Sequence, residues 1–340
     1  MSDTTPKDHP KTAADAEASS THWAQIGEST FVGGMRLLYH VHRFLGRWPF
    51  LLCLYPVVTY YWLSKPLARR SSIEYLQRLQ AAHGLWAKQP GWRESLRHFR
   101  VFAEVILDKL LAISGSYPTS KVTYSGHLPI LDLIDRGQGA LFVTAHLGCI
   151  ELCQALAEKR AGLRLNVLVH TKHAEKFNRL LNRVAPDSTV QFLQVTDFNA
   201  ATAMMLSERV ARGEFIAIAG DRVPVNKSKT TMAPFLGHAA EFPCGPFVIA
   251  SVLKCPLFLM SCTHAEADTG AGYALRIAEL AHRVELPRAR RDEALSEYAG
   301  AYAQQLEQLL TKAPFDWFNF FPFWAQGDAA TAAVSSTPEK

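Results

Sequence analysis

From Lys121 onward the sequence alternates between short apolar runs and longer segments with apolar residues at helical spacing. The runs are rich in β-branched and aromatic residues, which is typical of buried strands. The predicted strands are residues 122–125, 140–145, 165–170, 190–195, 215–220, 257–264 and 273–278. The predicted helices are 129–136, 150–161, 174–184, 199–211 and 246–253, with a long terminal helix at 292–312. This alternation predicts an α/β fold with a mostly parallel central sheet flanked by helices.

The residues before this alternation predict helices. Ser71-Ser-Ile-Glu74 has the form of a capping box and predicts a helix through His83, and residues 92–113 have amphipathic spacing. Residues 48–64 are rich in aromatics, have no charge and are flanked by basic residues. As a helix they span about 25 Å, less than a hydrocarbon core of about 30 Å. We expect them to lie in the cytoplasmic leaflet; an ordinary buried helical hairpin is the alternative.

These patterns divide the 340-residue chain into four parts. We expect a disordered lead at 1–22, an N-terminal helical region at 23–120 that contains the membrane-associated segment 48–64, an α/β domain at 121–325 and a flexible tail at 326–340. The lead contains acidic residues and no apolar core, so we expect no cleavable signal peptide.

Charge and cysteine content exclude some protein classes. The formal net charge is +5, which is small for a dedicated nucleic-acid binder, and no nucleic-acid-binding signature is present. This balance suits an anionic membrane surface or an acidic partner. The six cysteines form no CxxC pair and have neither zinc-site nor secreted-disulfide spacing. They are predicted to be reduced, mostly buried thiols in the cytosol.

One histidine stands at the edge of the predicted sheet where open α/β folds bind ligands. His146 follows the run 140–145, and Glu151 lies in the first turn of the next predicted helix. On one regular helix the two side chains would be about 140° apart, so they meet only if the chain turns sharply, which Gly148 permits. Glu151 would then accept from one imidazole nitrogen while the other takes a substrate proton. The alternative is a strand-capping histidine and a glutamate that complements the helix dipole.

Cys149 offers a rival mechanism. A thiol near a helix N-terminus and close to His146 has a lowered pKa and is able to act as an acyl-carrying nucleophile. A buried structural cysteine is the more common case.

Three further blocks have functional potential. Gly220-Asp221-Arg222 ends the predicted strand 215–220, at the same edge as His146. The loop around Lys227 and Lys229 suits phosphate or an acidic carrier protein, although simple solvation also explains it. The apolar stretch from Phe235 to Pro246 is shaped by Gly237 and Gly245; either it lines an acyl channel or it serves packing alone. No G-x-S-x-G, Walker A, H-E-x-x-H or G-x-G-x-x-G motif is present.

Taken together, these residues resemble the bacterial lipid A biosynthesis late acyltransferase family, within the lysophospholipid-acyltransferase-like superfamily. The matching blocks, in family order, are His146 to Glu151, Gly220-Asp221, Phe235-Leu-Gly237 and Pro243-Cys-Gly245-Pro246. The family also has a basic block, which falls here on His170-Thr-Lys172-His173 with Arg179 or Arg183. The resemblance extends from Trp23 to Trp324, and the joint order of the blocks is more specific than any one of them.

The resemblance implies a glycerolipid-acyltransferase-like fold and transfer of a fatty acyl group from acyl carrier protein, or acyl-CoA, to a lipid hydroxyl. The same resemblance implies that the reaction takes place at the cytoplasmic face of the cell inner membrane. His146 is then the general base and Glu151 orients it, while Arg183, Asp221, Arg222, Lys227, Gly237 and Gly245 are substrate-binding residues. Backbone N–H groups at the start of the Cys149 helix, or Arg222, would stabilise the oxyanion. No metal or other cofactor is expected, because a thioester is already activated.

Two departures bear on the acceptor. Arg222 follows Asp221 where lipid A enzymes usually have Gln or His, and the aromatic ending Trp317–Trp324 replaces a more basic one. Both features look like the branch associated with aryl-polyene lipid pathways, so the acceptor is either lipid A-like or an aryl-polyene lipid. A non-catalytic membrane-associated lipid-binding or assembly protein, and a hydrolase that uses the same dyad, are the alternatives.

Overall fold

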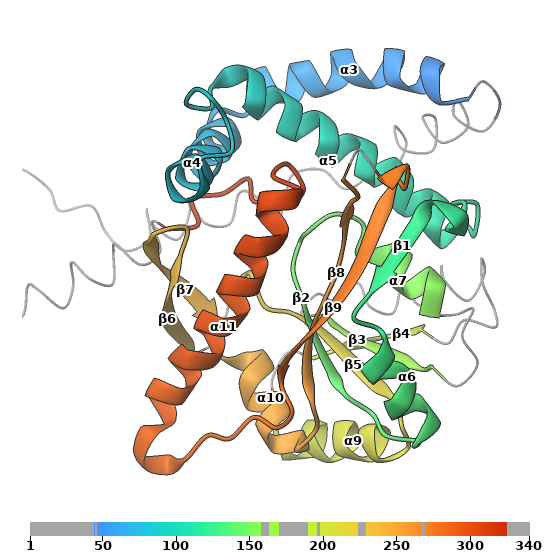
Figure 1. Cartoon of the computed structure of the whole chain (residues 1–340), viewed down its shortest axis with the longest axis vertical. Helices are drawn as coiled ribbons and strands as arrows, with labels where there is room; N and C mark the ends of the chain where they lie inside the picture. The colour runs from blue at the N-terminus through green and yellow to red at the C-terminus, as the bar shows by residue number, and fades with distance from the viewer. Residues whose placement is uncertain are drawn as a thin grey trace, which may run out of the picture. The chain divides into compact units, whose positions relative to one another are not determined.

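The structure is a computed structural model that describes residues 44, 46–157, 163–169, 190–195, 198–223, 229–266 and 269–324 (Figure 1). The chain divides into two units, Met1–Pro56 and Val57–Lys340. The predicted lead 1–22, the helix 174–184, the basic block 170–173 and the tail 326–340 lie outside the described residues.

Within the described residues, three α-helices precede the sheet, as predicted. They are α3 (Arg47–Ser64), α4 (Pro66–His83) and α5 (Trp92–Ile113). Helix α3 is apolar around its whole circumference. Among the described residues, no helix combines the length and the apolar character that crossing a membrane requires.

The predicted capping box at Ser71–Glu74 is wrong. Helix α4 begins with Pro66 in its first turn, five residues earlier, so Ser71 lies inside the helix and is buried. Proline is favoured at this position because its fixed φ suits the first turn and its missing N–H has no helical partner there. The buried Ser72 hydroxyl instead contacts His98 Nδ1 of α5 at 3.0 Å, which ties the two helices together.

The described strands form a seven-stranded sheet in the order β1-β9-β8-β2-β5-β3-β4. Every pairing is parallel except that of β8 with β9, so the prediction of a mostly parallel sheet is confirmed. The strands are β1 (Val122–Ser125), β2 (Leu141–Thr144), β3 (Leu165–Val169), β4 (Val190–Gln194), β5 (Phe215–Ala219), β8 (Leu257–His264) and β9 (Tyr273–Ala281). Each lies within two or three residues of its predicted bounds.

The two faces of the sheet bury separate cores. Alternation along β2 directs Leu141 and Val143 to one core and Phe142 to the other. The first core also receives side chains from α4, α9 (Ala200–Ala211), α10 (Gly245–Leu253) and α11 (Arg291–Lys312). The second receives them from α5, α6 (Leu128–Asp135) and α7 (Ile150–Ala157). Figure 1 shows α11 along one side of the sheet and α6 and α7 on the other.

A β-hairpin replaces the loop predicted around Gly237. Strands β6 (Thr230–Phe235) and β7 (His238–Pro243) pair antiparallel through a two-residue turn, Leu236-Gly237, in which both residues have positive φ. The side chains of Phe235 and Phe242 are fully buried in the first core. Packing, the simpler of the two predicted roles, is therefore what these aromatic residues do in the fold.

The last described residues, 313–324, form a closing segment over the carboxyl edge of the sheet. Trp317 forms an isolated antiparallel bridge with Leu147, and Phe318 N donates to His146 O at 2.9 Å. The Trp317 ring packs edge-on against Phe235 and Tyr75. The segment thus joins the loop after β2, the hairpin and α4.

Candidate active site

The loop after β2 bends at Gly148, which has φ +57°. A Cβ atom at this position would stand 2.1 Å from the carbonyl oxygen of Cys262, so only glycine fits. Cys149 N donates to that carbonyl at 2.8 Å, and Gly148 N donates to Asp316 O at 2.9 Å. The bend is therefore held by β8 on one side and by the closing segment on the other, and it leaves His146 at the edge of the sheet.

Asp221 is the partner of His146. Thr144 pairs with Ala219, and the two functional residues each follow their strand by two positions, which brings them level at the same edge. One carboxylate oxygen accepts from the His146 backbone N at 2.9 Å, and the other lies 2.8 Å from His146 Nδ1. The imidazole is thereby fixed in orientation, and its Nε2 remains for a substrate in a side chain that is 40% exposed.

The Asp221 carboxylate is buried, at 2% exposure, and ionised. Burial raises the pKa of Asp221, but the charge and hydrogen bonds of His146, together with the Arg222 charge, lower it to about 2. Trp317 Nε1 of the closing segment donates to the same carboxylate at 3.0 Å. A buried anion with three donors is a rigid acceptor for the imidazole.

Glu151 does not take the place expected for it. Its carboxylate accepts from Lys109 Nζ of α5 at 3.0 Å and lies 4.0 Å from the Cys149 thiol, whereas His146 Nδ1 faces Asp221. The predicted hydrogen bond from an imidazole nitrogen to Glu151 is corrected to one involving Asp221. The reason is that the turn at Gly148 directs the first turn of α7 toward α5, while β5 delivers Asp221 beside the ring.

The rival mechanism needs a lowered pKa of the Cys149 thiol, but the surroundings of the thiol raise it. Its side chain is fully buried, and this burial, together with the negative charge of Glu151, raises the pKa of the Cys149 thiol well above its usual range. A thiolate is the attacking species in acyl-thioester chemistry. The geometry therefore argues against Cys149 as a nucleophile.

Arg222 is the cation nearest in sequence to the His146–Asp221 pair. Its guanidinium Nη2 donates to Phe318 O at 3.0 Å and lies over the Phe321 ring, 5.6 Å from the centroid. Burial lowers the pKa of Arg222 and the Asp221 charge opposes that change. The N–H groups of Gly148 and Cys149 already donate to carbonyls, so these two groups are not available to an oxyanion.

The remaining predicted substrate-binding residues are dispersed or not described. Gly237 lies in the hairpin turn, and Gly245 is the first residue of α10. A Cβ atom on either would meet open space. Arg183 and Lys227 lie outside the described residues.

A second His–Asp pair, absent from the sequence prediction, repeats the geometry of the first. The Asp316 carboxylate accepts from His264 N at 2.6 Å and contacts His264 Nδ1 at 2.7 Å. Burial lowers the pKa of His264, but the bond and charge of Asp316, with the charges of Asp108 and Glu104, raise it overall. The sequence offers one signal for this pair: the predicted strand 257–264, which pairs with β2, also ends on a histidine.

The part of the chain that the structure describes contains no group of three or more His, Cys, Asp or Glu side chains placed to hold a metal ion.

Comparison with known proteins adds one match. The sequence model of a family described as bacterial lipid A biosynthesis acyltransferase matches residues 104–326, which is more than half of the chain. That range includes both His–Asp pairs and the closing segment. No curated protein matches the chain.

Proposed function

Because the chain belongs to the bacterial lipid A biosynthesis acyltransferase family, an acyltransferase family, we propose that it moves a fatty acyl group from a thioester donor to a hydroxyl of a lipid or glycolipid. The donor is acyl carrier protein or acyl-CoA. The single observation that supports this most is the His146 imidazole, held through Nδ1 by Asp221 while its Nε2 remains for a substrate.

The reaction begins when His146 Nε2 removes the proton of the acceptor hydroxyl. The oxygen attacks the thioester carbonyl, a C–O bond forms, and the tetrahedral intermediate collapses with cleavage of the C–S bond. The imidazolium then returns its proton to the leaving thiolate. Asp221 stabilises the imidazolium in this cycle, since its buried carboxylate is already ionised.

Arg222 is our proposed donor to the oxyanion. A guanidinium is a strong donor to developing negative charge in a partly dry site. Its position is supported from the closing segment by the bond to Phe318 O.

We place the reaction at the cytoplasmic face of the inner membrane, with acyl carrier protein as donor partner. Support comes from the large apolar side chains that α3 exposes to solvent. Trp48 is 84% exposed, Leu52 77% and Tyr60 68%. Aromatic and aliphatic side chains of this kind suit the interface between headgroups and acyl chains. The acceptor we propose is lipid A-like or an aryl-polyene lipid.

The test is acyl transfer by purified variants with an acyl-thioester donor. His146→Ala should lower kcat by about 100-fold or more, since proton transfer is lost. Asp221→Asn should lower kcat by nearly as much, because an amide cannot stabilise the imidazolium. Glu151→Gln should lower kcat less. Each variant needs an unchanged circular dichroism spectrum. If His146→Ala turns over normally, or if Glu151→Gln is as damaging as His146→Ala while Asp221→Asn is active, the proposed assignment is wrong.

Two controls address the other hypotheses. Stoichiometric lipid binding without transfer, unchanged by His146→Ala, would indicate a lipid-binding protein. Release of free fatty acid as the main product would indicate a hydrolase.

A further inference from the structure

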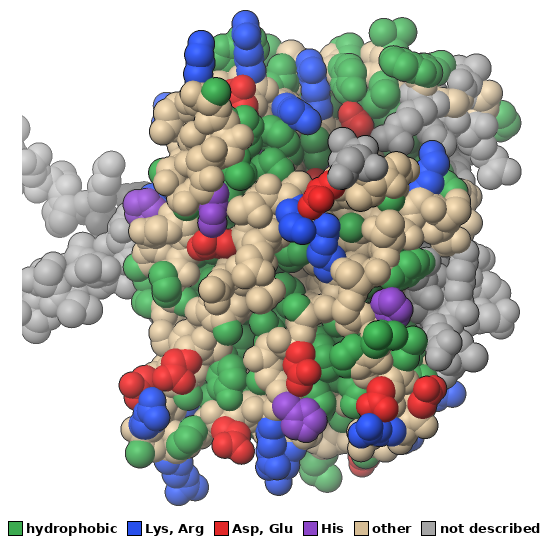
Figure 2. All heavy atoms as spheres, in the orientation of Figure 1, with side chains coloured by type: hydrophobic (Ala, Val, Ile, Leu, Met, Phe, Trp, Pro, Cys, Tyr) green, Lys and Arg blue, Asp and Glu red, His purple; other side chains and the backbone are tan. Residues whose placement is uncertain are grey.

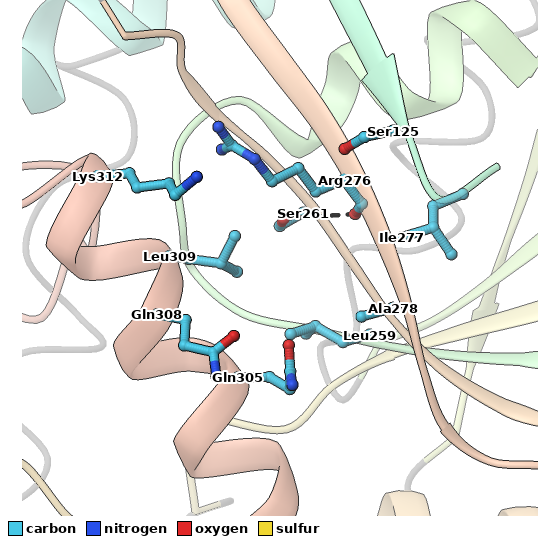
Figure 3. A pocket seen from close by; sticks show the side chains of 10 residues that line it. All are labelled: Ser125, Leu259, Ser261, Arg276, Ile277, Ala278, Gln305, Gln308, Leu309 and Lys312. Atoms are coloured by element: carbon cyan, nitrogen blue, oxygen red, sulfur yellow. Dashed lines mark hydrogen bonds between the residues drawn. The ribbon is translucent and has the colours of Figure 1, made fainter.

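A cavity of about 200 Å³ lies between α11 and the strands β1, β8 and β9 (Figure 3). It is distinct from the His146 site and shares no lining residue with it. Its lining residues are Ser125, Leu259, Ser261, Arg276, Ile277, Ala278, Gln305, Gln308, Leu309 and Lys312. Six of these ten residues are polar or charged, although the neighbouring parts of the same interface form the first hydrophobic core.

The sheet wall of the cavity is a row of three paired residues. Arg276 of β9 is in register with Ser125 of β1 on one side and with Ser261 of β8 on the other. Directly paired residues on adjacent strands point to the same face, so the backbone itself brings the guanidinium and the two hydroxyls together. Arg276 Nη1 donates to the fully buried Thr263 hydroxyl at 3.1 Å, which fixes one edge of the guanidinium and leaves its other donors available.

The side of the cavity formed by α11 also changes from apolar to polar along the helix. Gln305, Gln308, Leu309 and Lys312 have the i, i+3, i+4, i+7 spacing of one helix face. One turn earlier, Tyr302 is buried in the first core. The polar side chains thus begin where the helix passes over the Ser125–Arg276–Ser261 row, and Figure 3 shows Arg276 and Lys312 directed into the same space.

The charges of the cavity are unbalanced. Two of the described lining residues are cations, Arg276 and Lys312, and none is acidic. Lys312 Nζ reaches Glu266 at 3.3 Å, but this pair is at the surface, where ion pairs contribute little. Figure 2 shows blue side chains with a red one beside them at the centre of this face, over the position of β8 and β9 in Figure 1. Two cations that share one cavity repel each other, and Glu266, which does not line the cavity, offsets part of the Lys312 charge only.

We propose that this cavity binds a phosphate-class anion, either inorganic phosphate or the phosphate of a small headgroup. A guanidinium with free donors matches the geometry of phosphate oxygens. Lys312, the Ser125 hydroxyl and the glutamine amides add further donors, while the Ser261 hydroxyl already donates to Arg276 O at 3.4 Å. The volume is below the roughly 300 to 1,000 Å³ of sites for drug-sized ligands, which suits an anionic group better than a whole lipid.

The test is calorimetric titration of the full-length protein with inorganic phosphate at low ionic strength. Wild-type protein should bind in a saturable manner, and added salt should weaken binding because the interaction is electrostatic. Arg276→Gln should bind about tenfold more weakly or worse, which is the loss expected for a hydrogen bond to a charged group. Arg288→Gln is the matched control: it removes the same charge from an exposed residue that does not line the cavity, and it should bind as the wild type does.

Lys312→Gln provides a second variant if Arg276→Gln fails to fold, because Lys312 is at the surface; it should weaken binding several-fold. Glycerol 3-phosphate distinguishes the two sources of phosphate. Tighter, Arg276-dependent binding of glycerol 3-phosphate identifies a headgroup, and equal or weaker binding identifies free phosphate. The absence of saturable phosphate binding, or equal binding by wild type, Arg276→Gln and Lys312→Gln, overturns the proposal.

Discussion

A single carboxylate determines how His146 is presented. Asp221 accepts from both the backbone N and the Nδ1 of His146, and Trp317 adds a third hydrogen bond. The sequence placed Asp221 at the correct edge of the sheet but as a substrate-binding residue. Its partnership depends on β5 being the neighbour of β2 in matching register, and spacing along the chain does not reveal strand order.

Asp221 also makes stability depend on pH. Its pKa of about 2 in the folded protein lies below the ordinary value of 3.8, so its contribution is complete above about pH 4 and is lost as pH falls through about 2. A shift of this size corresponds to about 2 kcal/mol. Urea unfolding of wild type and Asp221→Asn should therefore show a difference in stability that shrinks across this window. A constant difference would contradict the ionised state of Asp221.

Gly148 has no tolerance for a side chain. Gly148→Ala should lower the free energy of unfolding by about 2 kcal/mol or more, since it combines a positive φ with a Cβ contact at 2.1 Å. Gly237→Ala is the matched control, because Gly237 has φ +77° but open space around it. The denaturant midpoints of the two variants measure the difference. Equal losses would mean that backbone conformation, and not the contact with Cys262, explains the glycine.

At the scale of elements, regular core strands were predictable and the hairpin was not. Strands β2, β5 and β8 are buried along nearly their whole length, and each begins with a run of three or more apolar residues. Strands β6 and β7 contain Pro234, several alanines and a Leu-Gly turn instead of the usual Asn-Gly, which hides the two-residue period. The second His–Asp pair escaped prediction for another reason: Asp316 belongs to a segment without secondary structure.

The closing segment should loosen when the His264–Asp316 pair is weakened. The pKa of His264 is raised above its ordinary value of 6.5, so the ion pair stabilises fully below about that pH and less as pH rises through the folded pKa. Asp316→Asn should lower the protection factors of the amides in residues 313–324, that is, their protection relative to intrinsic exchange, and remove the pH dependence of that protection. Hydrogen–deuterium exchange measures both effects. Wild-type protection of this segment that does not change with pH would contradict the role given to the pair.

At the scale of the whole molecule, the predicted α/β architecture and the family both hold. The compact unit Val57–Lys340 includes α4 and α5, which packing joins to the sheet: Lys109 of α5 reaches Glu151, and Tyr75 OH of α4 donates to Pro314 O at 2.8 Å. The sequence favours a boundary near residue 120 because the pattern changes there from helices to alternating strands and helices. Helical periodicity does not indicate what a helix packs against, so these long-range contacts were not predictable.

Membrane association is a prediction at this scale. Replacing Tyr60 and Leu63, which are 68% and 61% exposed on α3, by glutamate should reduce binding to anionic phospholipid vesicles by about tenfold or more. Met204→Glu is the control, because Met204 is 66% exposed on α9. Vesicle co-sedimentation measures the effect. Unchanged binding of the Tyr60 and Leu63 variant would assign the interaction to another surface.

The closing segment also has a consequence for biosynthesis. Residues 313–324 are made after the rest of the described chain, yet they supply Trp317 to Asp221, Asp316 to His264 and Phe318 N to His146 O. A growing chain emerges at about 5–20 residues per second, so the sheet is able to form before the site is complete. The His146 site of the nascent protein is therefore unfinished until residues 313–324 have emerged and packed against the sheet.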